Sequence, residues 1–143
     1  YGMHWCANLV CGPVGVANAV LMRAGEVVDG LEMASSRRPG VIPRDLARGP
    51  ARLTKTLGLG RDQNGIDTLS VDSALVVRAP VQGLWPASRS KAVRTGPRVG
   101  VSGPGGDAAT YPWRFWLEGE ATVSAYRPGT LRRPKPAVGS SGR

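Results

Sequence analysis

The chain contains one histidine, two cysteines and ten acidic residues, and each of these shortages argues against a class of site. Cys6 and Cys11 have neither the CxxC spacing nor the neighbouring histidines of a metal finger, so we expect two buried, reduced thiols and no metal. His4 has no Ser or Cys for which it is an obvious base. Most acidic residues fall in turns or at helix starts, and no pair of them suits general acid–base catalysis.

Nucleotide-binding and metalloprotease motifs are also missing. The sequence has no Walker loop, dinucleotide fingerprint or HExxH pattern, so we expect neither a cofactor nor a metal. No apolar run reaches the length of a transmembrane helix, and we expect no secretory signal peptide. These features favour a cytoplasmic protein that does not enter a membrane.

Positive charge is abundant. Nineteen Lys and Arg residues against ten Asp and Glu residues give a formal net charge of +9 and a pI of about 10.8. A balance this basic favours a polyanionic partner, with nucleic acid first and an anionic membrane surface second. An arginine-rich composition inherited from a high-GC genome would give the same balance without any such partner.

The length and composition predict one domain of short elements. A chain of 143 residues fits one domain, and its 20 Gly and 12 Pro predict much loop. The run Met3–Cys11 alternates along a strand, and Val16–Arg23 is predicted to return as its hairpin partner, with Val16, Val20 and Leu21 in the core. A helix is predicted over 27–37, and a second over 50–57 that starts at Pro50 and has Leu53 and Leu57 on one stripe. The other predictions are a strand over 75–78, an irregular stretch over 81–97, and a second hairpin of 113–117 with 122–126.

Asn8 and Arg23 are two of the polar residues in the first hairpin. Asn8 needs hydrogen-bond partners if it is buried, and Arg23 at the end of an apolar strand either reaches solvent or meets an anion. Each alone is more simply explained by packing or solvation. Together with Tyr1 on the same hairpin, they make a ligand site a competitive interpretation.

Six segments, in order along the chain, resemble the 3-methyladenine (alkyladenine) DNA glycosylase family. No single segment is specific, but the order of all six is, and together they reach from Tyr1 to about Tyr126. The segments are Tyr1–Asn8, Val20–Ala24, Ala47–Leu59, Gln63–Asp67, Gly96–Ser102 and Pro112–Leu117.

The resemblance implies an α+β fold: a single mixed domain with a curved antiparallel sheet, short helices and many loops, similar to the C-terminal domain of formyltransferases. It also implies a monofunctional base-excision repair enzyme that flips alkylated or deaminated purines, of the 3-methyladenine or hypoxanthine type, and hydrolyses the N-glycosidic bond. The implied partner is double-stranded DNA that contains a damaged purine. The implied protein is a cytoplasmic, nucleoid-associated monomer.

The resemblance assigns roles to particular positions. Tyr1 and Met3 would wedge into the DNA, which offsets an unstacking cost on the order of a few kcal/mol. Asn8 would disfavour guanine in the base pocket, and Arg23 would lie beside the flipped nucleotide. The remaining implied contacts, to the DNA backbone, are Arg38, Gly49, Arg52, Gly100 and Ser102.

The family's catalytic glutamate, together with the residues that stack on the flipped base, precedes the Tyr motif. We therefore expect residues 1–127 to be the C-terminal portion of the glycosylase domain, 128–143 to be a disordered basic tail, and the chain to be inactive alone. A non-enzymatic basic DNA-binding module is the alternative from another class, and an RNA-binding domain of related fold is a weaker one. Comparing damaged with undamaged duplex, and DNA with RNA, separates these alternatives.

Overall fold

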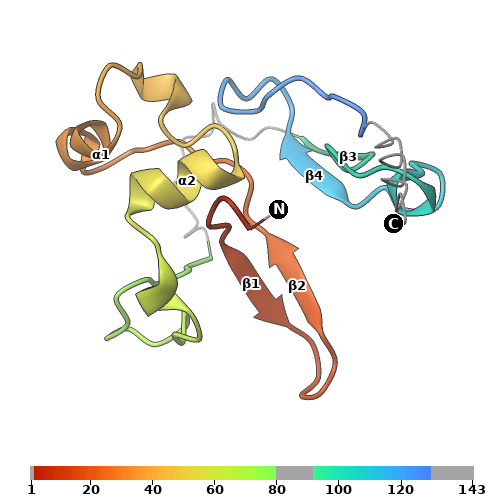
Figure 1. Cartoon of the computed structure of the whole chain (residues 1–143), viewed down its shortest axis with the longest axis horizontal. Helices are drawn as coiled ribbons and strands as arrows, with labels where there is room; N and C mark the ends of the chain where they lie inside the picture. The colour runs from red at the N-terminus through yellow and green to blue at the C-terminus, as the bar shows by residue number, and fades with distance from the viewer. Residues whose placement is uncertain (1, 80–91, 130–143) are drawn as a thin grey trace, which may run out of the picture. The chain divides into compact units, whose positions relative to one another are not determined.

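The structure is a computed structural model, and it describes residues 2–79 and 92–129. The chain folds into two compact units. The first comprises Tyr1–Ala92 and Leu117–Ser124, and the second comprises Val93–Trp116 and Ala125–Arg143. The helices and strands of Figure 1 are β1 Asn8–Cys11, β2 Asn18–Leu21, α1 Leu31–Arg37, α2 Pro50–Leu57, β3 Val93–Gly96 and β4 Arg114–Leu117.

The first unit contains the predicted hairpin, with shorter strands than expected. β1 and β2 pair antiparallel, with Asn8 opposite Leu21 and Val10 opposite Ala19. The amide of Met22 donates to the Ala7 carbonyl at 2.9 Å, which continues the register by one residue pair. The predicted strand pairing is therefore confirmed.

The predicted burial of this hairpin is wrong. Val16, Val20 and Leu21, expected in the core, are exposed. Cys6 and Cys11, expected to be buried, are free and exposed as well. A two-stranded sheet buries side chains only where another layer packs against it, so apolar composition alone does not place these residues in a core.

The core of the first unit lies beneath α2. Pro50 is the first residue of α2, where its missing N–H costs nothing, and Gly58 ends the helix in the left-handed conformation at φ 71°. Leu53 is buried on the predicted stripe, whereas Leu57 is 44% exposed. Thr56 donates its hydroxyl to the Leu46 carbonyl at 2.5 Å. The buried apolar residues are Ala34, Leu46, Ala47 and Leu53.

Helix α1 begins later than predicted and packs on α2. Gly30, at φ 66°, precedes its first turn, and the Asp29 carboxylate accepts the Gly30 amide at 2.8 Å. This turn prevents the helix from starting at Val27. The Arg37 guanidinium then donates to the Thr56 carbonyl of α2 at 2.9 Å, which ties the two helices together.

The second unit is organised by pairs of arginine and aromatic side chains. β3 pairs with β4, and a side chain on Gly96 would meet the Trp116 ring at 3.1 Å. The guanidinium carbon of Arg114 lies 4.5 Å from the centre of a Trp116 ring. Cation–π contacts of this kind contribute roughly 0.5–2 kcal/mol each.

Two further strand predictions are wrong. Residues 75–78 form no strand, and 122–126 do not pair with β4. The partner of β4 is β3, which falls in a stretch expected to be irregular. The α+β class, with short helices, small sheets and many loops, is confirmed. The predicted tail lies outside the described residues from 130 onward, so the predicted domain boundaries stay predictions.

Candidate nucleic-acid interface

Asn8 and Arg23 lie on the hairpin end nearest α2. Asn8 is exposed and stands opposite Leu21. Since side chains alternate along a strand, and the Met22–Ala7 hydrogen bond continues the register, Arg23 projects on the same face as Leu21 and Asn8. Arg23 is half-buried. One face of the hairpin therefore presents the amide and the guanidinium that were predicted as a base pocket.

An antiparallel bridge joins the end of this hairpin to the start of α2. Ala24 pairs with Arg48, and the Gly25 amide donates to the Ala47 carbonyl at 3.2 Å. In this register Arg23 stands opposite Gly49. Two residues that were predicted separately, one as a pocket residue and one as a DNA contact, are thus neighbours.

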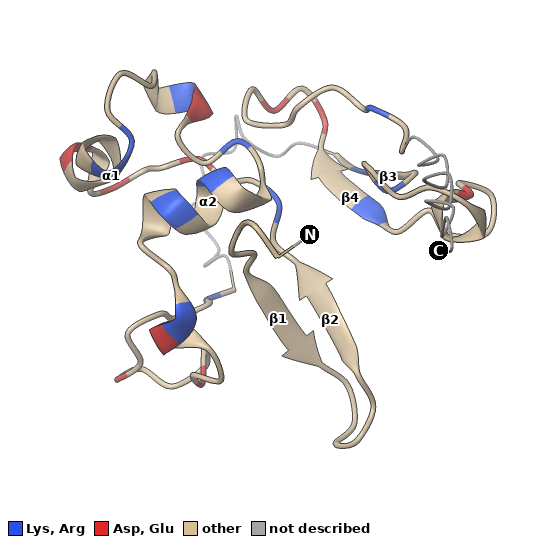
Figure 2. Cartoon of the chain, viewed as in Figure 1, with Lys and Arg blue, Asp and Glu red and all other residues tan. Residues whose placement is uncertain are grey.

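The first turn of α2 is arranged to receive an anion. Gly49 adopts φ 134° and ψ 152° and accepts the Leu53 amide at 2.8 Å, which starts the helix. Pro50 has no N–H, so the unbonded donors of this turn are the amides of Ala51 and Arg52. The Arg52 side chain is exposed, and its Cδ would lie 3.7 Å from a Cβ added to Gly49. Figure 2 shows that α2 carries basic residues. Helix dipole, amides and guanidinium all favour a phosphate here.

Two arginines next to this turn are bound to the protein itself. The Arg38 guanidinium donates to the Asp45 carbonyl at 2.7 Å and also to the Leu46 carbonyl. Arg48 bridges to the Asp45 carboxylate at 3.2 Å and donates to the Val123 carbonyl at 3.3 Å. Arg48 was missed in the sequence, where nothing distinguishes it from the other arginines. The implied DNA contact at Arg38 stays a prediction.

Asp45 belongs to this framework rather than to a reaction centre. The hydrogen bond from Arg44 lowers the pKa of the Asp45 carboxyl. Partial desolvation raises this pKa, but the hydrogen bond from the nearby Arg48 lowers it, so the net shift is downward. An acid with a lowered pKa stays ionised at neutral pH and is a poor proton acceptor. The role of Asp45 is to hold two arginines in place.

The second unit carries the other two implied backbone contacts. The Gly100 amide donates to the Arg127 carbonyl at 3.3 Å, and Ser102 is exposed. The Arg98 side chain supports this segment. Its guanidinium donates to the Gly105 carbonyl and lies 5.9 and 5.6 Å from the ring centres of Tyr111 and Trp113.

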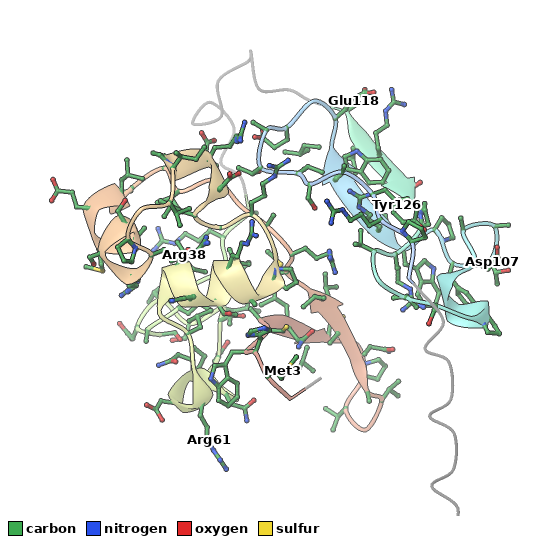
Figure 3. All side chains as sticks on the ribbon, turned by 45° about the horizontal axis from the view of Figure 1, so that its top comes forward. Met3, Arg38, Arg61, Asp107, Glu118 and Tyr126 are labelled. Atoms are coloured by element: carbon green, nitrogen blue, oxygen red, sulfur yellow. The ribbon has the colours of Figure 1, made fainter. Side chains whose placement is uncertain are left out.

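The implied DNA wedge is only partly described. Met3 is 73% exposed, as an inserting side chain must be (Figure 3). Tyr1 lies outside the described residues. Thr54 of α2 donates its hydroxyl to the Trp5 carbonyl at 2.9 Å, so the segment that carries Met3 is attached to the same helix as Arg52.

All ten acidic residues lie within the described ranges, and none of them is buried. Eight are exposed, and Asp45 and Glu120 are half-buried. The other resolved shift is also downward: the Thr110 hydroxyl, followed by the backbone amides of Ala109 and Thr110, lowers the pKa of Asp107. Burial raises the pKa of a general base toward neutrality, and no carboxyl here has that environment.

Among residues 2–79 and 92–129, no cluster of three or more His, Cys, Asp or Glu side chains is placed to hold a metal ion. No helix among the same residues has the length and apolar character needed to cross a membrane.

Comparison with known proteins shows what the chain is similar to. A family model of methylpurine-DNA glycosylases matches residues 1–121. Several relatives carry the name "Putative 3-methyladenine DNA glycosylase". The protein of Leifsonia xyli subsp. xyli is 52% identical over 132 residues, which cover 89% of this chain and 57% of that protein. The Frankia casuarinae protein is 45% identical over 139 residues, which cover 94% of this chain and 63% of that protein. The Streptomyces avermitilis protein is 46% identical over 137 residues, which cover 93% of this chain and 60% of that protein. The chain thus spans less than two thirds of the length of these curated relatives.

Proposed function

The chain belongs to the methylpurine-DNA glycosylase family, and from this premise we propose that it acts in base-excision repair of alkylated or deaminated purines. In that reaction a damaged purine, of the 3-methyladenine or hypoxanthine type, is flipped out of the duplex and its N-glycosidic bond is hydrolysed by water. The observation that carries the proposal is the Ala24–Arg48 bridge, which brings Arg23 beside the first turn of α2.

In this proposal, different residues of the first unit contact different parts of one DNA strand. The α2 amides and Arg52 bind a backbone phosphate, and this binding is independent of sequence. Arg23 lies next to them, where it contacts the flipped nucleotide. Asn8, on the same hairpin face, meets the base and rejects guanine, because a buried polar group left unpaired costs about 1–3 kcal/mol. Met3 and Tyr1 fill the gap in the stack.

We further propose that residues 1–143 alone bind DNA but do not excise the base. Water needs a positioned base to attack at a useful rate, and the ten carboxyls are exposed or half-buried. Activity then requires a general base from outside this chain. We expect the complete enzyme to act as a monomer at the nucleoid, within the cytoplasm.

Single-turnover excision tests the catalytic part of the proposal. Duplexes containing one hypoxanthine or one 3-methyladenine are incubated with an excess of purified 1–143, and free base is measured against the uncatalysed rate. We expect no excision above that rate. Measurable excision would mean that one of the ten carboxyls, or another group in the chain, serves as the base.

Binding to the same duplexes separates a repair protein from a non-enzymatic basic module. A glycosylase pocket predicts tighter binding to the damaged duplex than to the undamaged one, whereas a module binds both equally and loses both with added salt. Arg52→Ala is expected to weaken binding to both duplexes. Arg61→Ala is the matched control, because Arg61 is exposed and its side chain points away from the rest of the first unit (Figure 3).

A further inference from the structure

The Arg48 side chain joins two segments of the first unit that lie far apart in sequence. One guanidinium nitrogen, Nη1, donates to the Asp45 carboxylate at 3.2 Å, and the other, Nη2, donates to the Val123 carbonyl at 3.3 Å. Both partners belong to the first unit. Because the guanidinium is planar and rigid, these two hydrogen bonds fix the position of residue 48 relative to both segments.

The main chain of Arg48 adds a third attachment. Arg48 forms the antiparallel bridge with Ala24, the residue that follows Arg23. Gly49, the next residue along the chain, precedes the first turn of α2. Arg48 therefore lies between the two groups that are proposed to contact DNA, the guanidinium of Arg23 and the amides of the α2 turn.

Arg48 is poorly placed to contact DNA itself. Its side chain is 28% exposed, whereas that of the nearby Arg44 is 52% exposed. Its Nε is buried and has no hydrogen-bond partner in the described part of the chain. The Asp45 carboxylate also offsets its charge, so the side chain attracts a phosphate less than an extended arginine does. Any effect of Arg48 on DNA binding must then act mainly through the residues that it holds.

We propose that Arg48 is a positioning residue for DNA binding. Its three attachments set the position of Arg23 relative to the first turn of α2, and hence the spacing between the flipped nucleotide and the adjacent phosphate contact. This inference rests on the proposed function and adds to it a residue that acts without touching DNA. Lysine at position 48 would keep the charge, but a single ammonium group lacks the fork that reaches two segments at once.

Two substitutions separate positioning from charge. Arg48→Lys leaves the net charge unchanged, and Asp45→Asn makes the chain more positive. Charge alone therefore predicts that the first variant binds damaged duplex DNA like the parent and that the second binds it more tightly. Positioning predicts weaker binding by both variants, by about two- to thirtyfold, the range in which residues without a ligand contact change affinity.

Matched controls carry the same substitutions at positions without the second attachment. Arg44 also donates to Asp45, at 3.3 Å, but has no hydrogen bond to a second segment among the described residues, so Arg44→Lys should bind like the parent. Asp62 is exposed, so Asp62→Asn should bind at least as tightly as the parent. Urea denaturation identifies conditions in which every variant is folded, and affinities are compared there. If Arg48→Lys does not fold, Asp45→Asn decides alone, since its expected effect opposes that of charge.

A double-mutant cycle distinguishes positioning of the α2 turn from a general loosening of the protein. If Arg48 acts through this turn, the loss of affinity on Arg48→Lys becomes smaller in the Arg52→Ala background, because one of the contacts that depend on the turn is already gone. Additive losses would overturn the inference. Parent-like or tighter binding by both Arg48→Lys and Asp45→Asn would overturn it as well.

Hydrogen exchange tests the same role without DNA. The Gly25 amide donates to the Ala47 carbonyl beside the bridge, whereas the Met22 amide donates to the Ala7 carbonyl in the hairpin. Arg48→Lys is expected to speed exchange at Gly25 about two- to tenfold, the equivalent of one hydrogen bond, and to leave Met22 unchanged. An unchanged rate at Gly25 would overturn the inference. Failure of the unaltered chain to bind any duplex would refute the proposed function instead, and the exchange rates would still decide whether Arg48 holds the turn.

Discussion

Replacing Gly49 by alanine perturbs the start of α2 through backbone strain alone. Gly49 has φ 134° and ψ 152°, a conformation that is almost exclusive to glycine. An added Cβ would lie 3.7 Å from the Arg52 Cδ, which is an ordinary contact, so no clash adds to the strain. The substitution therefore isolates the conformational requirement of this turn.

The expected cost follows from two opposing effects. Holding a non-glycine residue in this region costs about 1–3 kcal/mol. Alanine also restricts the unfolded chain, which returns about 0.4–1 kcal/mol. The net loss of stability is about 1–2 kcal/mol, a large share of the total for a protein with so few buried apolar residues.

Urea denaturation of 1–143 measures this loss as a lower midpoint with an unchanged slope. Gly60→Ala is the control, because Gly60 has φ −142° and an added Cβ would make only an ordinary contact with the Gln63 Oε1 at 4.0 Å, so it should not lose stability. If the strain is relieved by moving the first turn, DNA affinity falls along with stability. A Gly49→Ala protein as stable as the parent would show that this backbone conformation is not required.

In a binding titration at several salt concentrations, Arg52→Ala should lower DNA affinity for every sequence and reduce the slope of log affinity against log salt by about 1. An unchanged slope would mean that Arg52 makes no phosphate contact. Thr56→Val should cost about 1 kcal/mol in urea denaturation, because the Leu46 carbonyl loses one of its donors; no loss would mean that this buried hydroxyl contributes nothing. The pKa of Asp45 is lower in the folded protein than its unfolded value of about 3.9, so the stability it contributes is present above that pH and lost as the pH falls through the folded pKa. Asp45→Asn should flatten the acid limb of a stability–pH curve below about pH 4, and an identical limb would contradict this.

Local rules predicted α2 and the first hairpin. Pro50 at a helix start depends only on neighbours in sequence, and the structure retains it. Of the two leucines predicted on one stripe, Leu53 is buried and Leu57 is exposed. The turn near Pro13 likewise joins β1 to β2, with the Val16 amide donating to the Pro13 carbonyl at 3.1 Å. These features follow from backbone geometry and are insensitive to the rest of the fold.

Predictions that needed a distant partner failed. Strand β4 was matched to 122–126 because they are adjacent, yet it pairs with β3, and Thr122 is buried instead. Burial of Val16 and Val20 required a covering layer that apolar patterning does not supply. The bridge between Ala24 and Arg48 has no signal in either segment, so Arg23 and Gly49 could be predicted separately but not as neighbours.

The tethered arginines bear on how fast the proposed DNA complex would form. Arg37 donates to a backbone carbonyl, and Arg114 lies on an indole ring, so these two groups keep their charge but are held away from extended conformations. A fixed charge contributes to the long-range field that accelerates encounter, whereas a close phosphate contact needs a side chain that can extend. For the proposed DNA complex we therefore expect the net charge of +9 to set the association rate, and the smaller set of exposed, untethered arginines, Arg52 among them, to set the lifetime.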